Sequence, residues 1–150
     1  MKAVYIESHG GPEVLIYGDR PEPALQAGEV KVRVRAAALN RLDTYSRAGG
    51  RGLRRTFPPP LILGGDCAGD VIDVDDAAVG LKPGDRVVIN PRITCGRCPA
   101  CLSGRDDLCS HSRFMGTALD GSYAEYVAVP AVNAHPIADQ VSYEEAAAVP

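Results

Sequence analysis

The sequence has no tryptophan, only two phenylalanines, and no run of about 18 apolar residues. The last absence excludes a membrane-spanning helix. No run rich in Lys and Arg occurs either, and the formal net charge is −3, which argues against a nucleic-acid partner. The first ten residues, MKAVYIESHG, lack the apolar segment of a signal peptide. We therefore expect a cytoplasmic protein with reduced cysteines and with no membrane or nucleic-acid partner.

A Gly-x-Gly-x-x-Gly turn between a strand and a helix is missing as well. The nearest stretch, Gly49-Gly50-Arg51-Gly52, lacks the preceding strand and the βαβ context. In Rossmann domains this turn holds the pyrophosphate of a dinucleotide. The 150 residues have the size of one domain, and we expect no nucleotide-binding domain among them. We also expect that these residues alone do not catalyse hydride transfer.

Cysteine, in contrast, is present in a pattern. Four of the five cysteines are spaced Cys-x2-Cys-x2-Cys-x7-Cys: Cys95, Cys98, Cys101 and Cys109. Four thiolates at such spacing are typical of a closed, structural Zn²⁺ site, and a pair of disulfides is the alternative. The expected reducing compartment favours zinc. His111 breaks the four-cysteine spacing and is not expected to be a ligand, and Cys67, outside the spacing, is expected to be a buried, inert thiol.

The rest of the sequence indicates a mainly β protein. Apolar residues alternate with polar ones, or form short runs, between Gly and Pro clusters. The expected strands are 2–7, 13–17, 29–34, 67–75, 85–89 and 122–129. Many short strands joined by such turns are typical of a barrel or a sandwich.

Two short helices interrupt this pattern. The first is expected over 41–48, with Asn40 as the N-cap, Asp43 in the first turn and Gly49 after its end. The second starts at Ser142, where Ser142 and Glu145 form a capping box. It has room for little more than one turn, so we expect that the native protein continues.

Seven stretches, in order along the chain, carry a resemblance to a known family. They are 11–15 (GPEVL), 38–45 (ALNRLDTY), 63–71 (LGGDCAGDV), 80–87 (GLKPGDRV), the four-cysteine segment, 121–126 (GSYAEY) and 144–147 (EEAA). The chain resembles the GroES-like catalytic domain of the medium-chain, zinc-type dehydrogenases and reductases. This resemblance covers essentially residues 1–150. It implies a partly open β-barrel with a zinc lobe, and a separate nucleotide-binding domain in a complete enzyme.

The resemblance also shows where this sequence departs from zinc alcohol dehydrogenases. Two ligands of the family's catalytic zinc, a cysteine and a histidine, correspond here to Asn40 and Gly65, neither of which can replace them. The acidic residue after the histidine is kept as Asp66. The hydroxyl of the proton relay corresponds to Leu42, and a relay histidine of some members to Tyr45. We therefore expect the structural zinc and no catalytic zinc.

Without these ligands, the sequence is similar to the quinone-reductase branch of the family, in which a hydride from NAD(P)H is transferred to an electron-poor acceptor. By this resemblance the catalytic residues are Asn40, Tyr45 and Asp66, and the cofactor contacts come from Asn40 and Arg41. Each also has a plain structural alternative: Asn40 caps a helix, the Tyr45 ring packs, Arg41 is a solvated surface residue and Asp66 holds the pocket. The substrate is expected to be a small quinone, enone, aldehyde or alcohol, and homo-oligomerisation is left open.

Two further hypotheses stay open at this point. One is an alcohol dehydrogenase that builds its catalytic zinc site from other residues, such as Asp66 or Cys67. The other is a free-standing, zinc-stabilised module without activity. Of the remaining histidines, His9 is expected to border the pocket of a full enzyme and His135 to be exposed.

Overall fold

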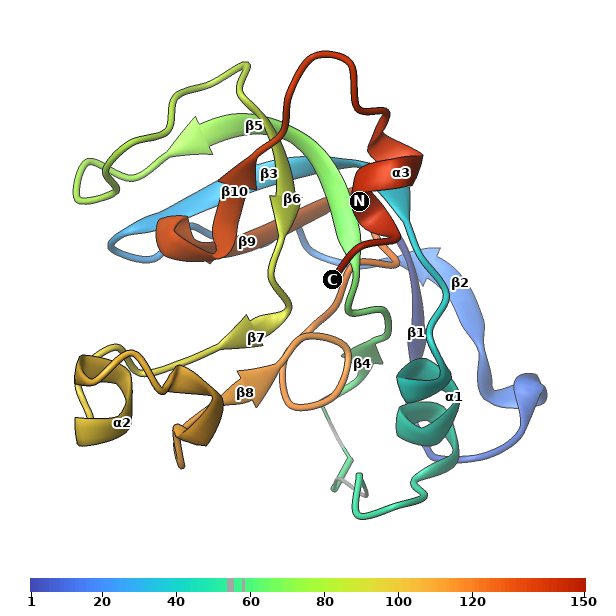
Figure 1. Cartoon of the computed structure of the whole chain (residues 1–150). Helices are drawn as coiled ribbons and strands as arrows, with labels where there is room; N and C mark the ends of the chain where they lie inside the picture. Colours follow the sequence, from blue (N-terminus) through green and yellow to red (C-terminus); the bar gives the residue numbers. More distant parts are fainter. Residues whose placement is uncertain (54–55, 58) are drawn as a thin grey trace.

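The computed structural model describes residues 1–53, 56–57 and 59–150, and its strands form three antiparallel sheets (Figure 1). The largest has five strands in the order β10-β6-β5-β3-β9: Ala134–Pro136, Arg86–Ile89, Cys67–Val74, Glu29–Ala37 and Tyr126–Pro130. A second sheet has the order β2-β1-β4: Ile16–Asp19, Lys2–Ile6 and Leu61–Ile62. The third is a ribbon of β7 and β8: Arg92–Ile93 and Arg113–Phe114. The mainly β fold with a partly open barrel is confirmed.

The core lies on one face of the five-stranded sheet. Val30 and Val32 of β3 are fully buried, whereas Arg33 and Arg35, on the opposite face, are exposed, as period-two alternation requires. The cluster that they join consists of Val71, Val87, Ile89, Met115, Val127, Val129 and several smaller residues. Bulges in the β3–β5 pairing bend this sheet into the curved half-barrel.

Both expected helices are present. Helix α1 spans Arg41–Ala48 and begins at Asn40, whose Oδ1 accepts the Leu42 N–H, and it ends at Gly49 with φ of 70°. Helix α3, Tyr143–Ala147, has the predicted capping box at Ser142 and packs its small residues on β5. The remaining turns of helix are short: η1 Pro12–Val14, α2 Pro99–Leu102, η2 Asp106–Leu108 and η3 Ala131–Asn133. No helix in the described ranges has the length and apolarity needed to cross a membrane.

Two expected strands are wrong in part. The segment 13–17 begins as a 3₁₀ turn, because Pro12 starts a helical turn in which Leu15 N–H bonds the Pro12 carbonyl, and only Ile16 onward is strand. Likewise 122–129 becomes regular strand only at Tyr126. Its first half forms hydrogen bonds to both larger sheets: the Tyr123 carbonyl accepts from Val4 N–H of β1, whereas the Glu125 carbonyl accepts from Val34 N–H of β3. This segment therefore joins the two larger sheets.

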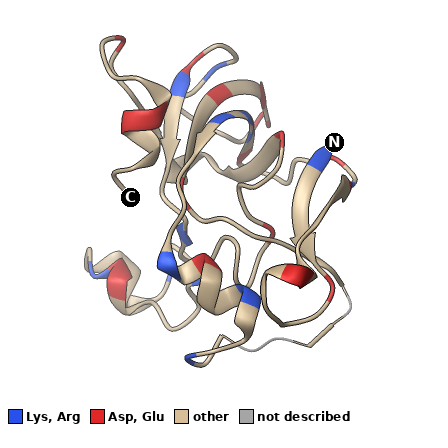
Figure 2. Cartoon of the chain, turned by 90° about the vertical axis from the view of Figure 1, so that its right-hand side faces the viewer, with Lys and Arg blue, Asp and Glu red and all other residues tan. Residues whose placement is uncertain are grey.

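Charged residues of both signs are interspersed over the face seen in Figure 2, as on an ordinary solvated surface. A hydrogen bond ties α3 to the sheet: Asp70 of β5 accepts from the Tyr143 hydroxyl of α3, and it also forms an ion pair with Arg35 of β3, whose Nε lies at 2.7 Å. Partial burial raises the pKa of Asp70, but these two donors more than offset it, and the net pKa is lowered.

The closest backbone approach in the large sheet is at Gly69. A Cβ there would lie 2.0 Å from the Arg33 carbonyl oxygen, and no rotamer change relieves a clash with backbone. We expect Gly69→Ala to lower the free energy of unfolding by about 3 kcal/mol, measured by urea denaturation of the zinc-loaded protein. Gly50→Ala is the control, since a Cβ at Gly50 meets nothing within 4 Å. Equal denaturation midpoints for the two variants would contradict the prediction.

Candidate active-site pocket and metal centre

The four cysteines of the motif converge in a lobe, residues 95–109, that projects from the barrel beyond β7 (Figure 1). Cys95 lies in the loop after β7, Cys98 caps α2, Cys101 lies within α2, and Cys109 ends η2. Gly96 and Gly104, both with positive φ, allow the tight turns between them. Local turns, rather than long-range pairing, therefore bring the sulfurs together.

The sulfur positions fit a tetrahedral zinc ion. All four Sγ atoms lie within 4.8 Å of one another, with Cys98–Cys101 at 3.5 Å, Cys95–Cys109 at 3.6 Å and Cys95–Cys101 at 4.0 Å. A tetrahedron with Zn–S bonds of about 2.3 Å requires S–S separations of about 3.8 Å. All five cysteines are free thiols, so the disulfide alternative is not supported. The predicted four ligands are the ones that the fold assembles, and His111 is not among them.

The electrostatics around these sulfurs also suit a metal. The backbone N–H groups of Arg97 and Cys98 point at Cys95 and lower its pKa to about 6, which stabilises a thiolate. The effect on Cys101 is opposite to that on Cys95: burial and hydrogen bonds with the neighbouring thiols raise the pKa of Cys101 to about 11. The metal-free cluster thus keeps protons that binding of zinc would release.

A second site, here called the candidate pocket, opens between α1, β6 and the start of β7. It has a volume of about 700 Å³ and contains none of the lobe cysteines. Its apolar wall is formed by Leu42, Val88, Ile89, Pro91 and Phe114. Its polar groups are the side chains of Asn40, Asp43, Asp66, Asn90, Arg92 and His135. A mostly apolar cavity with a few polar groups is the usual form of a small-molecule site.

Asn40 is the centre of the polar side of this pocket. Its Oδ1 is used by the helix cap, and its Nδ2 donates to Asp66 Oδ2 at 3.1 Å. The Asn40 backbone N–H donates to Asp43 Oδ2 at 2.8 Å, which completes the capping box. An amide nitrogen has two hydrogens, and Asp66 takes one of them. The second Nδ2 hydrogen has no partner among the described residues and is available to a ligand.

Two buried carboxylates hold this arrangement. Asp66 and Asp43 are each 7% exposed, and Asp43 accepts the Tyr123 hydroxyl at 2.7 Å. Partial burial, and then the hydrogen bond to Asp43, raise the pKa of Tyr123 well above its usual range. Tyr123 thus stays protonated as a donor. Its contact with Asp43, 80 positions away, is not predictable from a local sequence pattern.

Of the four positions at which the sequence is expected to depart from zinc alcohol dehydrogenases, Asn40, Leu42 and Gly65 line the pocket and Tyr45 does not. Gly65 contributes backbone only, although a Cβ there would find ordinary contacts with Pro91 at 3.6 Å. Leu42 contributes an aliphatic side chain that cannot transfer a proton. Among the residues that the structure describes, the lobe cysteines form the one group of three or more His, Cys, Asp or Glu side chains placed to hold a metal ion.

Comparison of the sequence with known protein families identifies the family of this domain. The family model for the alcohol dehydrogenase GroES-like domain matches residues 26–139. The chain belongs to this family. The fold, the lobe and the relatives together place this GroES-like domain within the medium-chain zinc-type dehydrogenases.

Relatives and solved structures agree with this assignment. An L-threonine 3-dehydrogenase of Pseudoalteromonas translucida (strain TAC 125) is 33% identical over 126 residues, 84% of this chain and 37% of the relative. The crystal structure of an NAD-dependent alcohol dehydrogenase is 46% identical, with a TM-score of 0.94 over 100% of this chain and 43% of that protein. A cobalt- and zinc-bound thermostable alcohol dehydrogenase from Pyrobaculum aerophilum is 34% identical, with a TM-score of 0.90. The match covers 100% of this chain and 44% of that protein. The domain thus spans less than half the length of each of these proteins.

The GroES-like domain brings together only some of the residues predicted for its site. Asn40 and Asp66 meet in the pocket, but Tyr45 and Arg41 do not line it. The Tyr45 ring is covered by the Arg51 guanidinium at 4.9 Å, and Arg41 is exposed at the start of α1. Their proposed roles in proton donation and pyrophosphate binding stay predictions.

Three other expectations concern residues beside the pocket. Cys67 is fully buried in β5, as predicted, and desolvation raises its pKa to about 12, which disfavours the thiolate. It does not line the pocket. His9 lies against α1, with Nδ1 3.0 Å from the Ser46 carbonyl, and is not among the lining residues. His135 is exposed as expected but does line the pocket, together with Asn90 and Arg92, which sequence reasoning missed.

Proposed function

We propose that residues 1–150 form the catalytic domain of an NAD(P)-dependent oxidoreductase that reduces a conjugated carbonyl compound, such as a quinone or enone, without a catalytic zinc. One observation carries the proposal: the pocket presents Asn40, Leu42 and Gly65, where a zinc-dependent member needs metal ligands and a relay hydroxyl. The lobe then holds a structural zinc alone. Bound NAD(P)H supplies the hydride, from a nucleotide-binding domain outside these 150 residues.

Within this proposal the chain's own residues position and polarise the substrate. The free Nδ2 hydrogen of Asn40 donates to the substrate carbonyl oxygen, on which negative charge develops during reduction. The other Nδ2 hydrogen of Asn40 is bonded to Asp66, and Asn40 Oδ1 accepts from the Leu42 N–H. The Asn40 side chain is therefore already oriented before the substrate binds. The apolar wall that includes Val88 and Phe114 limits access of water to the reacting atoms.

A second candidate function is zinc-dependent alcohol oxidation. The relatives named above are an alcohol dehydrogenase or a threonine dehydrogenase, and one was crystallised with zinc and cobalt. Asp66 and His135 of the pocket are ligand types for zinc. A third ligand would then have to come from the part of the enzyme outside this chain.

Metal content and substrate preference separate the two candidates. We expect one zinc per chain in the enzyme that carries this domain, measured by elemental analysis after exhaustive dialysis. We also expect NAD(P)H-dependent reduction of a benzoquinone or an enone that survives dialysis against a chelator mild enough to leave the lobe zinc. Two tightly bound zinc ions per chain, with alcohol oxidation that is lost on chelation and regained with zinc, would refute the proposal and support the alternative.

A further inference from the structure

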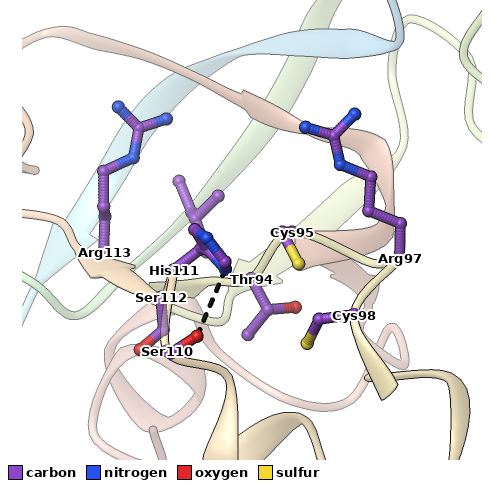
Figure 3. Close-up of a pocket in the computed structure, with 9 residues that line it drawn as sticks. Thr94, Cys95, Arg97, Cys98, Ser110, His111, Ser112 and Arg113 are labelled. Carbon is purple, nitrogen blue, oxygen red and sulfur yellow. Dashed lines mark hydrogen bonds between the residues drawn. The ribbon is translucent and has the colours of Figure 1, made fainter. Parts of the chain in front are cut away.

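A second cavity, of about 820 Å³, lies on the outer side of the β7–β8 ribbon, next to the cysteine lobe. It shares no lining residue with the candidate pocket. Its lining residues include three that carry or can carry positive charge: Arg97, His111 and Arg113. In Figure 3 the arginine side chains extend toward the same edge of the view, on opposite sides of His111. Among the residues that the structure describes, none of those lining the cavity is acidic.

The two arginines are not used elsewhere in the described part of the chain. Neither guanidinium has an ion-pair or hydrogen-bond partner there, in contrast to two arginines nearby. Arg105 pairs with Asp107 at 3.2 Å, and Arg92 donates to the Asp107 carbonyl and lies over the Phe114 ring. Arg92 and Arg105 therefore have partners within the described part of the chain, whereas the guanidinium groups of Arg97 and Arg113 remain available to a ligand.

Hydroxyl groups line the same cavity. Ser110, Ser112 and Thr94 contribute three, and Ser110 Oγ lies 3.3 Å from His111 Nδ1 (Figure 3). Guanidinium forks together with hydroxyl donors match the several oxygen atoms and the double charge of a phosphoryl group. A carboxylate, with two oxygens and one charge, would use fewer of these donors.

We propose that this cavity binds the phosphoryl group of a phosphate-bearing small molecule, between Arg97 and Arg113. The phosphoryl oxygens accept from the guanidinium groups and from the serine and threonine hydroxyls. The volume of about 820 Å³ exceeds what one phosphoryl group fills and leaves room for an attached organic group. Ile93 provides an apolar contact for that group.

Strand geometry makes this site separate from the candidate pocket but adjacent to it. In the ribbon, Arg92 pairs with Phe114, and Ile93 pairs with Arg113. Successive residues of a strand point to opposite faces, and paired residues share a face. Accordingly Arg92 and Phe114 line the candidate pocket, whereas Ile93 and Arg113 line the cavity beside the cysteine lobe.

An alternative use of the arginines must be separated from anion binding. Four thiolates and one Zn²⁺ carry a net charge of −2, and Cys95 and Cys98 also line the cavity. Arg97 and Arg113 would then only offset the charge of the metal site. In that case their removal weakens zinc binding, and no phosphate binds to the loaded protein.

The test titrates zinc-loaded protein with inorganic phosphate and with pyrophosphate, followed by calorimetry and by ³¹P NMR. A salt concentration of about 0.15 M screens non-specific attraction to surface charge. We expect saturable binding, weakened about tenfold or more by Arg97→Gln and by Arg113→Gln. Both positions are exposed, so the substitutions leave the fold intact.

Arg105→Gln is the matched control, since Arg105 is an exposed arginine of the same lobe that already has a partner. Its affinity for phosphate is expected to equal that of the parent protein, and zinc content is measured for every variant. Three results would overturn the proposal: no saturable binding, equal affinities in all three variants, or loss of zinc from the Arg97 and Arg113 variants in parallel with any loss of phosphate. None of them bears on the candidate pocket, whose function is tested separately.

Discussion

Cys98→Ser is expected to abolish zinc binding and to unfold the lobe formed by residues 95–109, while the barrel strands persist. Cys98 Sγ is one of four sulfurs within 4.8 Å, and the lobe has few other contacts that would hold it. A structural zinc site contributes on the order of 10 kcal/mol of apparent binding free energy, coupled to the ordering of its loop. The measurements are zinc content by elemental analysis and amide hydrogen exchange resolved along the chain.

The control for this experiment is the fifth cysteine. Cys67→Ala removes a thiol that lies outside the lobe, in the buried core of β5. It is expected to keep one zinc per chain and to lose stability modestly through the small cavity that it leaves. Unchanged zinc content in Cys98→Ser, or lost zinc in Cys67→Ala, would contradict the assignment of the site.

Asn40→Ser is expected to lower kcat of the full enzyme about 100-fold while leaving its thermal stability nearly unchanged. Serine keeps an oxygen that can cap α1, because Ser and Asn are about equally good N-caps. It loses the amide nitrogen that bonds Asp66 and offers a hydrogen to the substrate. The measurement is steady-state reduction of a quinone or an enone, compared with a thermal unfolding curve.

Asn40→Ala supplies the complementary control, because it removes both the cap and the amide. We expect the same loss of kcat, together with a loss of about 1 kcal/mol of stability. The pair thus separates the helix-capping role of Asn40 from its role in the pocket. If Asn40→Ser retained full kcat, Asn40 would be only a cap, and hydrogen bonding to the substrate would have to come from another residue.

The elements that the sequence predicted correctly are those governed by neighbours in the chain. Helix α1 has the expected bounds because Asn40, Asp43 and Gly49 act within three turns of one another. The four-cysteine cluster follows from three short gaps, because the spacing alone limits where the sulfurs can lie. Period-two alternation of charged and apolar residues identified β3, although the structure extends it to Ala37.

Short strands and shared hydrogen bonds were not predictable in this way. The strands β4, β7 and β8 have two residues each, too few for any periodicity. The segment before β9 alternates like a strand, but its partners are divided between two sheets, which a local pattern does not encode. Pro12 likewise started a turn in a stretch whose apolar residues favoured a strand.

The sequence by itself determined the family, the β-rich class, the helix caps and the four cysteines that cluster. The tertiary structure decided which residues face one cavity: it joined Asn40 to Asp66 and Asp43 to Tyr123, and it left Tyr45 outside. It also directs one face of the β7–β8 ribbon toward the candidate pocket and the other face toward the cavity beside the cysteine lobe. The reason is physical: capping and metal spacing depend on a few consecutive residues, whereas a pocket depends on the register and curvature of strands that are distant in the chain.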